Sequence, residues 1–356
     1  MERGGKTLFQ DMTIEELRSI MRTEKLALID VRSPSEYNNA TIPGSINIPF
    51  FNDVERAEIG TLYKQVSPET AKERGLQIIS AKLPDFVKRF SKIEGKKVVF
   101  CWRGGMRSKT SATVLDLMGI HVHRLKGGYR CYRNWVVQTM ENLEWNAKAL
   151  VLNGHTGSGK TKMLKKLAQE NYPVIDLEGM ANHRGSIFGQ IGLQPHNQKT
   201  FDALLIEQIE LFKQSPVILV EGESKRIGRV LLPDFLLAKK AQGMQFIIEV
   251  PIEQRTKEII NEYQPWKHEK ACLEAFRRIK KRIHTPIAKT IEEDLKLGRY
   301  DIAVRLLLEY YYDPLYDYTT KQIPNEKKII IKAKDITEAR AYRLLKEQID
   351  RSYRIA

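Results

Sequence analysis

The sequence predicts an α/β protein of two domains, each organised around a parallel sheet. Short apolar segments alternate with segments of helical periodicity along most of the chain, and this alternation is typical of parallel sheets covered on both faces. The chain is 356 residues long, which exceeds the length at which one hydrophobic core usually keeps growing. We therefore expect a first domain over residues 1–138 and a second, with a doubly wound sheet, over 139–356.

Within the first domain, the pattern predicts strands and helices in alternation. Thr13 and Glu16 have the spacing of a capping box, so we expect a helix that begins there and continues to Met21. The segments that follow are strand 27–31, helix 83–90, strand 97–100 and helix 108–118. Strand 97–100 leads into a cysteine-containing loop, which is expected at the carboxyl edge of the sheet, where such sheets bind ligands.

The second domain has the same alternation, interrupted by one long insertion. Strands are expected over 149–153, 173–177, 217–220, 245–250 and 328–332. A helix is expected over 162–169, and Asp335 with Glu338 predicts the start of a final helix to about Ile349. Between residues 253 and 321 the chain becomes helical, basic and rich in tyrosine, and we interpret this region as an insertion.

The loop after strand 97–100 is a candidate catalytic site with the sequence Cys101-Trp102-Arg103-Gly104-Gly105-Met106-Arg107-Ser108. We expect Cys101 to be the nucleophile, because backbone N–H groups curled around it and the dipole of the following helix stabilise a thiolate and a bound anion. The predicted anion loop consists of Arg103, Gly104, Gly105, Met106 and Arg107. Its glycines let the backbone approach an anion closely, and its arginines add charge-assisted hydrogen bonds. The alternative is a buried structural thiol.

A second loop has the pattern of a phosphate-binding loop. Its sequence is Gly154-His155-Thr156-Gly157-Ser158-Gly159-Lys160-Thr161, and it lies between an expected strand and an expected helix, as such a loop requires. Backbone N–H groups of the turn and the Lys160 ammonium are expected to bind phosphate groups. The predicted phosphate-binding residues are Gly154, Gly157, Ser158, Gly159, Lys160 and Thr161.

Supporting residues are expected after two other strands. Glu221 follows segment 217–220, where other phosphate-binding domains place a carboxylate that holds Mg²⁺ or its water. Segment 176–189 is rich in glycine and polar side chains, and we interpret it as a substrate-contacting loop that contains Asp176, Glu178, His183 and Arg184. The alternative is a structural loop, and His183 by itself is compatible with a hydrogen-bonded structural histidine.

The charge balance favours a polyanionic partner. Lys and Arg outnumber Asp and Glu by 59 to 44, which gives a net charge of +15. The candidates for contact with a nucleic-acid backbone are Arg277, Arg278, Lys280, Lys281 and Arg282. The tyrosines between residues 310 and 318 are candidates for stacking on unpaired bases. The alternatives are a charge excess that aids solubility, a solvated basic helix face, and tyrosines buried against the sheet.

Cysteine usage and hydropathy limit the class of protein. Cys101, Cys131 and Cys272 form no metal-ligand spacing and no even disulfide framework, which suits a reducing compartment. No apolar run reaches the roughly 18 residues needed to span a bilayer, and the N-terminus lacks the apolar core of a signal peptide. We therefore expect a cytoplasmic protein without a membrane partner. Cys131 is a candidate resolving thiol only if the fold brings it close to Cys101.

Four segments of the first domain resemble the rhodanese sulfurtransferase domain in order and spacing. They are 30–37, 42–49, the Cys101 loop and 125–129. The first segment contributes Asp30 and Arg32 as supporting site candidates. Five residues separate Cys101 from Arg107, whereas common single-domain rhodaneses have four. The longer loop has the spacing of cysteine phosphatases, and we expect it to accommodate a larger anion than a lone persulfide sulfur.

The fusion of the two loops, with segments 176–185 and 311–316, closely resembles the bacterial tRNA 2-selenouridine synthase family over essentially the full length. The resemblance implies replacement of sulfur by selenium at carbon 2 of the wobble uridine (position 34) in tRNA that carries 2-thiouridine, with selenophosphate as donor. It also implies that geranyl diphosphate alkylates the 2-thio group before selenium enters. On this basis, the loop with Lys160 would bind the diphosphate. Cys101 would accept selenium as a selenenylsulfide or cradle selenophosphate.

Two other functions are compatible with the sequence. A small-molecule kinase fused to a sulfurtransferase would use Lys160 with Mg²⁺ and need no RNA. A cysteine phosphatase is favoured by the spacing between Cys101 and Arg107. Neither function explains the basic, tyrosine-rich insertion. No cofactor or metal site is predicted, although Mg²⁺ is compatible with a phosphate-binding loop, and the sequence predicts no oligomeric state.

Overall fold

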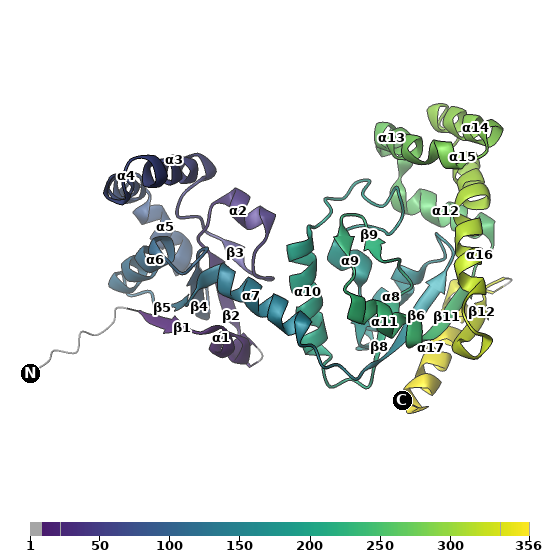
Figure 1. The fold of residues 1–356 in the computed structure, drawn as a ribbon, viewed down its shortest axis with the longest axis horizontal. Coiled ribbons are helices and arrows are strands. Elements are labelled where there is room, and N and C mark those ends of the chain that lie inside the picture. Colours follow the sequence, from purple (N-terminus) through teal and green to yellow (C-terminus); the bar gives the residue numbers. More distant parts are fainter. Residues whose placement is uncertain (1–8, 22, 335, 356) are drawn as a thin grey trace, which may run out of the picture. The chain divides into compact units, whose positions relative to one another are not determined.

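Two units make up the chain, Met1–Leu143 and Glu144–Ala356, in a computed structural model that describes residues 9–21, 23–334 and 336–355 (Figure 1). The boundary expected at residue 138 falls inside helix α7 (Gly128–Glu141). Tyr132 and Val136 on this helix are at most 1% exposed, so the helix packs into the first unit. The boundary therefore follows Leu143, because the helix is completed before the chain leaves the first core.

The first unit is built on a five-stranded sheet in which every strand pair is parallel. The strand order is β1 (Gln10–Met12), β5 (Val122–Leu125), β4 (Lys96–Phe100), β2 (Leu26–Asp30) and β3 (Ile46–Asn47). The predicted parallel sheet is confirmed. The strands β2 and β4 are buried at their carboxyl ends, as expected where helices cover a parallel sheet.

Helices connect these strands. They are α1 (Ile14–Met21), α2 (Pro34–Asn39), α3 (Asp53–Gln65), α4 (Pro68–Ser80), α5 (Leu83–Ser91), α6 (Met106–Leu117) and α7. The predicted capping box is present, since Thr13 N donates to Glu16 Oε2 (2.8 Å) and Glu16 N donates to Thr13 Oγ1 (3.2 Å). The sequence pattern did not predict α3, because this helix buries none of its residues and has little apolar periodicity.

The second unit contains the predicted doubly wound sheet. Its strand order is β12 (Lys328–Lys332), β11 (Met244–Glu249), β6 (Lys148–Gly154), β8 (Val217–Glu221) and β7 (Val174–Ile175), with every pair parallel. The first of these strands in the chain, β6, lies between β11 and β8, so the chain winds away from it in both directions. The loop after β6 therefore lies where such sheets bind ligands. A short antiparallel pair, β9 (Arg226–Ile227) and β10 (Val230–Leu231), follows β8.

Both faces of this sheet are covered. The helices α8 (Lys160–Gln169) and α17 (Glu338–Ile355) share one hydrophobic core with Leu150 and Leu152 of β6. Val151 points to the opposite face because strand side chains alternate, and it is 1% exposed. The remaining helices around the sheet are α9 (Leu177–Ala181), α10 (Gln198–Leu211) and α11 (Asp234–Gln242). Asp335, the expected cap of α17, lies outside the described residues, and Thr337 Oγ1 accepts a hydrogen bond from Arg340 N (3.2 Å).

The insertion is a group of helices with a core of its own, formed around Phe276, Ile291 and Leu307. Its members are α12 (Ile252–Tyr263), α13 (Glu269–Ile279), α14 (Thr285–Lys296), α15 (Tyr300–Leu307), the π-helical turn η3 (Leu308–Tyr312) and α16 (Asp313–Lys321). The basic stretch over residues 276–284 is not one helix, because α13 ends at Ile279 and a 3-10 turn (Lys280–Arg282) precedes α14, which has Pro286 in its first turn. No helix among the described residues is long and apolar enough to cross a membrane.

Candidate functional site

Cys101 lies between the carboxyl end of β4 and the N-terminus of α6, and it is 3% exposed. Its Sγ is 3.2 Å from Oγ of Ser108, a fully buried residue on the first turn of α6. Within the part of the chain that the structure describes, no protein group accepts a hydrogen bond from the backbone N–H groups of Arg103, Gly104 or Gly105. These donors and the helix N-terminus are therefore available to an anion beside Cys101.

The Cys101 loop packs backbone to backbone against the start of α7. Tyr129 N donates to the Cys101 carbonyl (2.9 Å), and Arg130 N donates to the Trp102 carbonyl (2.9 Å). Gly128 has a φ of +61°, and a Cβ there would lie 2.2 Å from the Cys101 carbonyl oxygen. Only glycine fits at this contact, which is the physical reason for a glycine at the start of α7.

Arg107 is held by Glu36 of α2, a residue that sequence reasoning did not select. Nη2 of Arg107 lies 3.0 Å from Oε1 of Glu36, and Nη1 contacts Oε2. Burial lowers the pKa of Arg107, but the hydrogen bonds to Glu36 more than offset this effect and leave the pKa raised. Glu36 lies within segment 30–37, and the resemblance of that segment to the rhodanese domain could have marked it as a site residue. Arg103 and Met106 are exposed.

Asp30 and Arg32 form a buried ion pair in which Nη2 lies 2.6 Å from Oδ2. The Arg32 guanidinium also stacks over the ring of Tyr129 at 4.3 Å. These contacts connect the end of β2 to the start of α7, which packs against the Cys101 loop. The ion pair therefore helps to position that loop. Cys131 lies on the same first turn of α7, and burial raises the pKa of its thiol, which disfavours the thiolate form.

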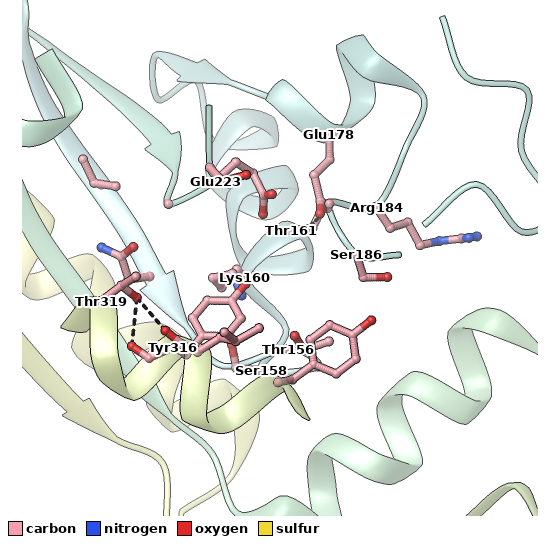
Figure 2. Close-up of a pocket in the computed structure, with 18 of the residues that line it drawn as sticks. Thr156, Ser158, Lys160, Thr161, Glu178, Arg184, Ser186, Glu223, Tyr316 and Thr319 are labelled. Carbon is pink, nitrogen blue, oxygen red and sulfur yellow. Dashed lines mark hydrogen bonds between the residues drawn. The ribbon is translucent and has the colours of Figure 1, made fainter. Parts of the chain in front are cut away.

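The phosphate-binding loop forms one wall of a cavity of about 1140 Å³ in the second unit (Figure 2). Lys160 Nζ donates to the carbonyls of Gly154 (2.6 Å) and His155 (3.2 Å). Gly157 and Gly159 have φ values of +80° and +78°, a backbone region that favours glycine. Ser158 is buried just before α8, whose N-terminus points its N–H groups and positive dipole end at an anion.

Four carboxylates line this cavity, and two of them, Glu178 and Glu223, lie near the phosphate-binding loop (Figure 2). Glu178 Oε2 accepts a hydrogen bond from Thr161 Oγ1 (2.8 Å). A Cβ at Gly185 would lie 2.8 Å from Oε1 of Glu178 and 2.5 Å from Oε2 of Glu223, so both carboxylates converge there. Burial and then repulsion from Glu223 raise the pKa of Glu178 to about 7. Glu223 was not an expected site residue, although it lies just beyond the end of β8.

Glu221 is not among the residues that line the cavity, and its expected place beside Mg²⁺ or its water stays a prediction. It is 1% exposed, and its Oε2 accepts hydrogen bonds from the backbone N–H groups of Leu177 (2.8 Å) and Glu178 (3.2 Å). Burial and then the neighbouring carboxylate of Glu178 raise its pKa. The physical reason for the position is that the N–H groups at the start of α9 hold the carboxylate.

The other residues of segment 176–189 have different positions. Asp176 caps α9, since its Oδ1 accepts from Gly179 N (2.7 Å). His183 is 7% exposed, packs between Gly189 and Gly228, and is not among the residues that line the cavity, so its substrate contact stays a prediction. Arg184 lines the cavity, with its guanidinium 4.7 Å from the Tyr263 ring centroid and Nε 3.0 Å from Oε1 of Glu262.

Tyrosines of the insertion cover the phosphate-binding loop, a position that the sequence did not predict. Tyr311, Tyr312 and Tyr316 line the cavity, and the Tyr316 ring lies over Lys160 (Figure 2). Tyr310 and Tyr318 are 45% and 69% exposed. The structure therefore divides the tyrosine cluster into members that line the cavity and members that are exposed to solvent.

The basic residues expected to contact nucleic acid lie on α13 and the turn that follows it. Arg277, Arg278, Lys281 and Arg282 are exposed. Lys280 contacts Glu292, and Nε of Arg277 lies 3.8 Å from the same carboxylate, so part of the positive charge is neutralised. Arg278, Lys281 and Arg282 remain the stronger candidates for phosphate contacts.

Comparisons with known proteins match both units. A model described as the tRNA 2-selenouridine synthase AAA domain matches residues 147–348, and a rhodanese-like domain model matches residues 13–134. A tRNA 2-selenouridine synthase from Sulfurovum sp. (strain NBC37-1) is 35% identical, with 85% of this chain and 91% of the relative covered. A protein of the same name from Aeromonas salmonicida (strain A449) is 31% identical, with 86% and 90% covered. The solved rhodanese-related protein from Thermoplasma volcanium is 19% identical, with 36% of this chain and 93% of its own covered and a TM-score of 0.23.

Proposed function

The chain belongs to the tRNA 2-selenouridine synthase family, and on this premise we propose that it replaces the sulfur of wobble 2-thiouridine by selenium through an S-geranyl intermediate. Selenophosphate is the selenium donor and geranyl diphosphate is the alkylating substrate. The observation that carries the proposal is that one chain contains two anion-binding loops, one beside the buried thiol of Cys101 and one that contains Lys160.

The phosphate-binding loop serves the alkylation step. The thiocarbonyl sulfur attacks carbon 1 of the geranyl group, a carbon–sulfur bond forms, the bond to diphosphate breaks, and the proton on N3 of the base is lost. Negative charge develops on the leaving diphosphate, where Lys160 and the N-terminus of α8 stabilise it. Alkylation also converts the sulfur into a better leaving group for the second step.

Mg²⁺ fits the same site as an accessory to the diphosphate. The Thr161 hydroxyl and the Glu178 carboxylate are hydrogen-bonded oxygen ligands at the mouth of the loop, and Glu223 lies beside them. Among the described residues no group of three His, Cys, Asp or Glu forms a metal site, so the ion would share its coordination with the phosphate oxygens. When bound, the ion neutralises charge on the leaving diphosphate.

The Cys101 loop serves the selenium step. Its free N–H groups, together with Arg103 and the Glu36-held Arg107, bind the phosphate part of selenophosphate. Selenium bonds to carbon 2 of the base, geranylthiol leaves, and hydrolysis of the selenium–phosphorus bond releases phosphate. Cys101 contacts the donor within this loop, and it is the residue whose loss is expected to stop selenium entry.

The tRNA is bound through its backbone by the exposed cations Arg278, Lys281 and Arg282. Wobble bases lie in a single-stranded loop, so the reacting base can be turned out without melting a duplex. The reaction takes place in the cytoplasm, where the tRNA substrate is found.

The test is mass spectrometry of nucleosides from 2-thiouridine tRNA incubated with selenophosphate and geranyl diphosphate. We expect the intact protein to form 2-selenouridine, Lys160→Ala to lose S-geranylation, and Cys101→Ala to accumulate the S-geranyl nucleoside. If Lys160→Ala leaves geranylation intact while Cys101→Ala abolishes it, the assignment of the two loops is wrong. Nucleotide turnover that needs no tRNA would instead favour a kinase.

A further inference from the structure

A narrow apolar cavity of about 50 Å³ adjoins the phosphate cavity in the second unit. The wall residues that the two cavities share are Thr156, Ser186, Ile259, Tyr263 and Tyr312. Leu295, Val304 and Leu307 of helices α14 and α15 line the narrow cavity and not the phosphate cavity. Leu295 and Leu307 are at most 5% exposed and belong to the core of the insertion, so this part of the wall lies in the packed interior.

The apolar wall begins at the phosphate-binding loop itself. A Cβ at Gly157 would lie 2.8 Å from both Cγ1 and Cδ1 of Ile259, so this isoleucine is in contact with the loop backbone. A ligand with its phosphates on the loop would therefore place the next few atoms against hydrocarbon.

Two of the three tyrosine hydroxyls that line the narrow cavity already have partners, and the hydroxyl of Tyr312 is buried without one among the described residues. The hydroxyl of Tyr263 is 3.1 Å from Oγ of Ser186, and the hydroxyl of Tyr300 donates to Glu269 Oε1 (3.1 Å). A sugar or a nucleobase would lose hydrogen bonds with water on entering and find few replacements, whereas a hydrocarbon would not. The geometry thus favours an apolar chain over a nucleoside.

We propose that this cavity receives the end of the hydrocarbon chain of a prenyl diphosphate and that Leu295, Val304 and Leu307 limit the chain to ten carbons. The inference rests on the proposed function, because it assumes that the diphosphate lies on the loop with Lys160. A single water occupies about 10–15 Å³ on the same scale, so a cavity of about 50 Å³ admits a branched group of a few carbons. The terminal isoprenyl group therefore lies in the cavity, and the first isoprenyl group lies against Ile259.

Direct binding separates the chain site from the diphosphate site. Geranyl diphosphate and inorganic diphosphate are titrated calorimetrically into the full-length protein. We expect geranyl diphosphate to bind at least about tenfold more tightly, with the more negative heat-capacity change that apolar burial produces. Equal affinities would overturn the chain site and leave the diphosphate site intact. Failure of both ligands to bind would instead refute the proposed function of the loop.

Chain-length selectivity provides the second test, with dimethylallyl, geranyl and farnesyl diphosphates as donors to 2-thiouridine tRNA. Val304→Trp fills the cavity and is expected to lower kcat/KM for geranyl transfer at least about tenfold while dimethylallyl transfer is retained. Leu307→Ala deepens the cavity and is expected to raise farnesyl transfer relative to geranyl transfer about tenfold. Misfolding lowers activity with every donor, so it does not account for a gain in farnesyl transfer.

Matched controls come from the same helix. Ile302 on α15 is 43% exposed and lies outside both cavities, so Ile302→Trp and Ile302→Ala should keep the wild-type order of chain lengths. An order that is unchanged in both Val304→Trp and Leu307→Ala contradicts the proposal. If the wild-type protein alkylates tRNA with none of the three donors, the proposed function fails and not the chain site alone.

Discussion

The ring centroid of Tyr316 lies 5.5 Å from Nζ of Lys160, so an aromatic side chain of the helical insertion covers the cation of the phosphate-binding loop. Two further pairs hold the covering segment in place. Arg255 Nη2 lies 2.6 Å from Oδ2 of Asp313, and His155 Nε2 lies 2.9 Å from Oδ1 of Asp317. The insertion is therefore part of the phosphate site as well as a candidate surface for tRNA.

Tyr316→Ala is expected to raise KM for geranyl diphosphate about 2- to 30-fold, which corresponds to the loss of one cation–π contact. Tyr316→Phe keeps the aromatic ring and should retain most of the affinity. The measurement is the rate of S-geranylation against donor concentration. Tyr318→Ala, on the same helix but 69% exposed, is the control and should leave KM unchanged. Equal effects of the alanine variants at 316 and 318 would contradict the covering role.

Glu36→Gln is expected to lower the free energy of unfolding by about 1–3 kcal/mol, because the largely buried Arg107 charge loses its carboxylate partner. We also expect loss of selenium entry with S-geranylation retained. Thermal unfolding and nucleoside mass spectrometry measure the two effects. Glu58→Gln breaks a solvent-exposed pair with Arg74 and should cost no more than about 1 kcal/mol. Normal selenium entry in Glu36→Gln would argue against a role for the pair in the anion loop.

The Glu178 carboxyl, with its pKa of about 7, should make the phosphate site sensitive to pH. At limiting Mg²⁺ the geranylation rate is expected to rise as pH increases through about 7, because only the ionised carboxylate ligates the metal. Glu178→Gln should flatten this profile.

The free energy of unfolding should fall with rising pH, whereas the geranylation rate should rise. The pKa of Glu178 is raised in the folded state, so the folded protein binds the proton more tightly than the unfolded chain. The free energy of unfolding is therefore expected to fall as pH rises from about 4.5 to 7, and Glu178→Gln should reduce that slope. Urea unfolding at several pH values measures it, and an identical slope in the variant would refute the assignment.

Gly128→Ala tests the close packing of α7 against the Cys101 loop. The positive φ alone costs about 1–2 kcal/mol for a residue with a Cβ, and the contact 2.2 Å from the Cys101 carbonyl adds to this cost. We expect a larger loss of unfolding free energy than in Gly119→Ala, where φ is +74° and no atom lies within 4 Å of the added Cβ. Selenium entry should fail in Gly128→Ala while S-geranylation continues. Equal stability of the two variants would contradict the predicted clash.

Replacing Lys281 and Arg282 by glutamine is expected to weaken tRNA binding and to lower the slope of log affinity against log salt by about 1–2. When one phosphate contact is lost, tRNA binding releases about one counterion fewer. Filter binding at several salt concentrations measures the slope. The control is replacement of both Lys199 and Lys213, exposed basic residues of the second unit, by glutamine. This control should leave the salt slope unchanged. An unchanged slope in the first variant would remove this segment from the tRNA surface.

The two loops and the strands that lead into them were predictable from the sequence. In both loops the proposed ligand-binding groups are backbone N–H donors at a helix start, and local glycines and apolar strand residues specify that geometry. Thr13 and Glu16 likewise specify their helix start through contacts three residues apart. Helix α3 has no buried residue, so its sequence lacked the periodicity that such predictions need.

The order of the strands along the chain and the two loops that contain Cys101 and Lys160 therefore follow from short-range patterns in this chain. The partners of those residues depend on packing between distant segments. Glu36 reaches Arg107 from another helix, Tyr316 reaches Lys160 from the insertion, and the apolar cavity exists only where α12, α14 and α15 meet. Tertiary contacts also decide which of Glu221 and Glu223 lines the phosphate cavity. Backbone N–H groups at the start of α9 bind the Glu221 carboxylate, and Glu223 lines the cavity. No local pattern specifies such contacts, since each depends on how whole helices pack against the sheet.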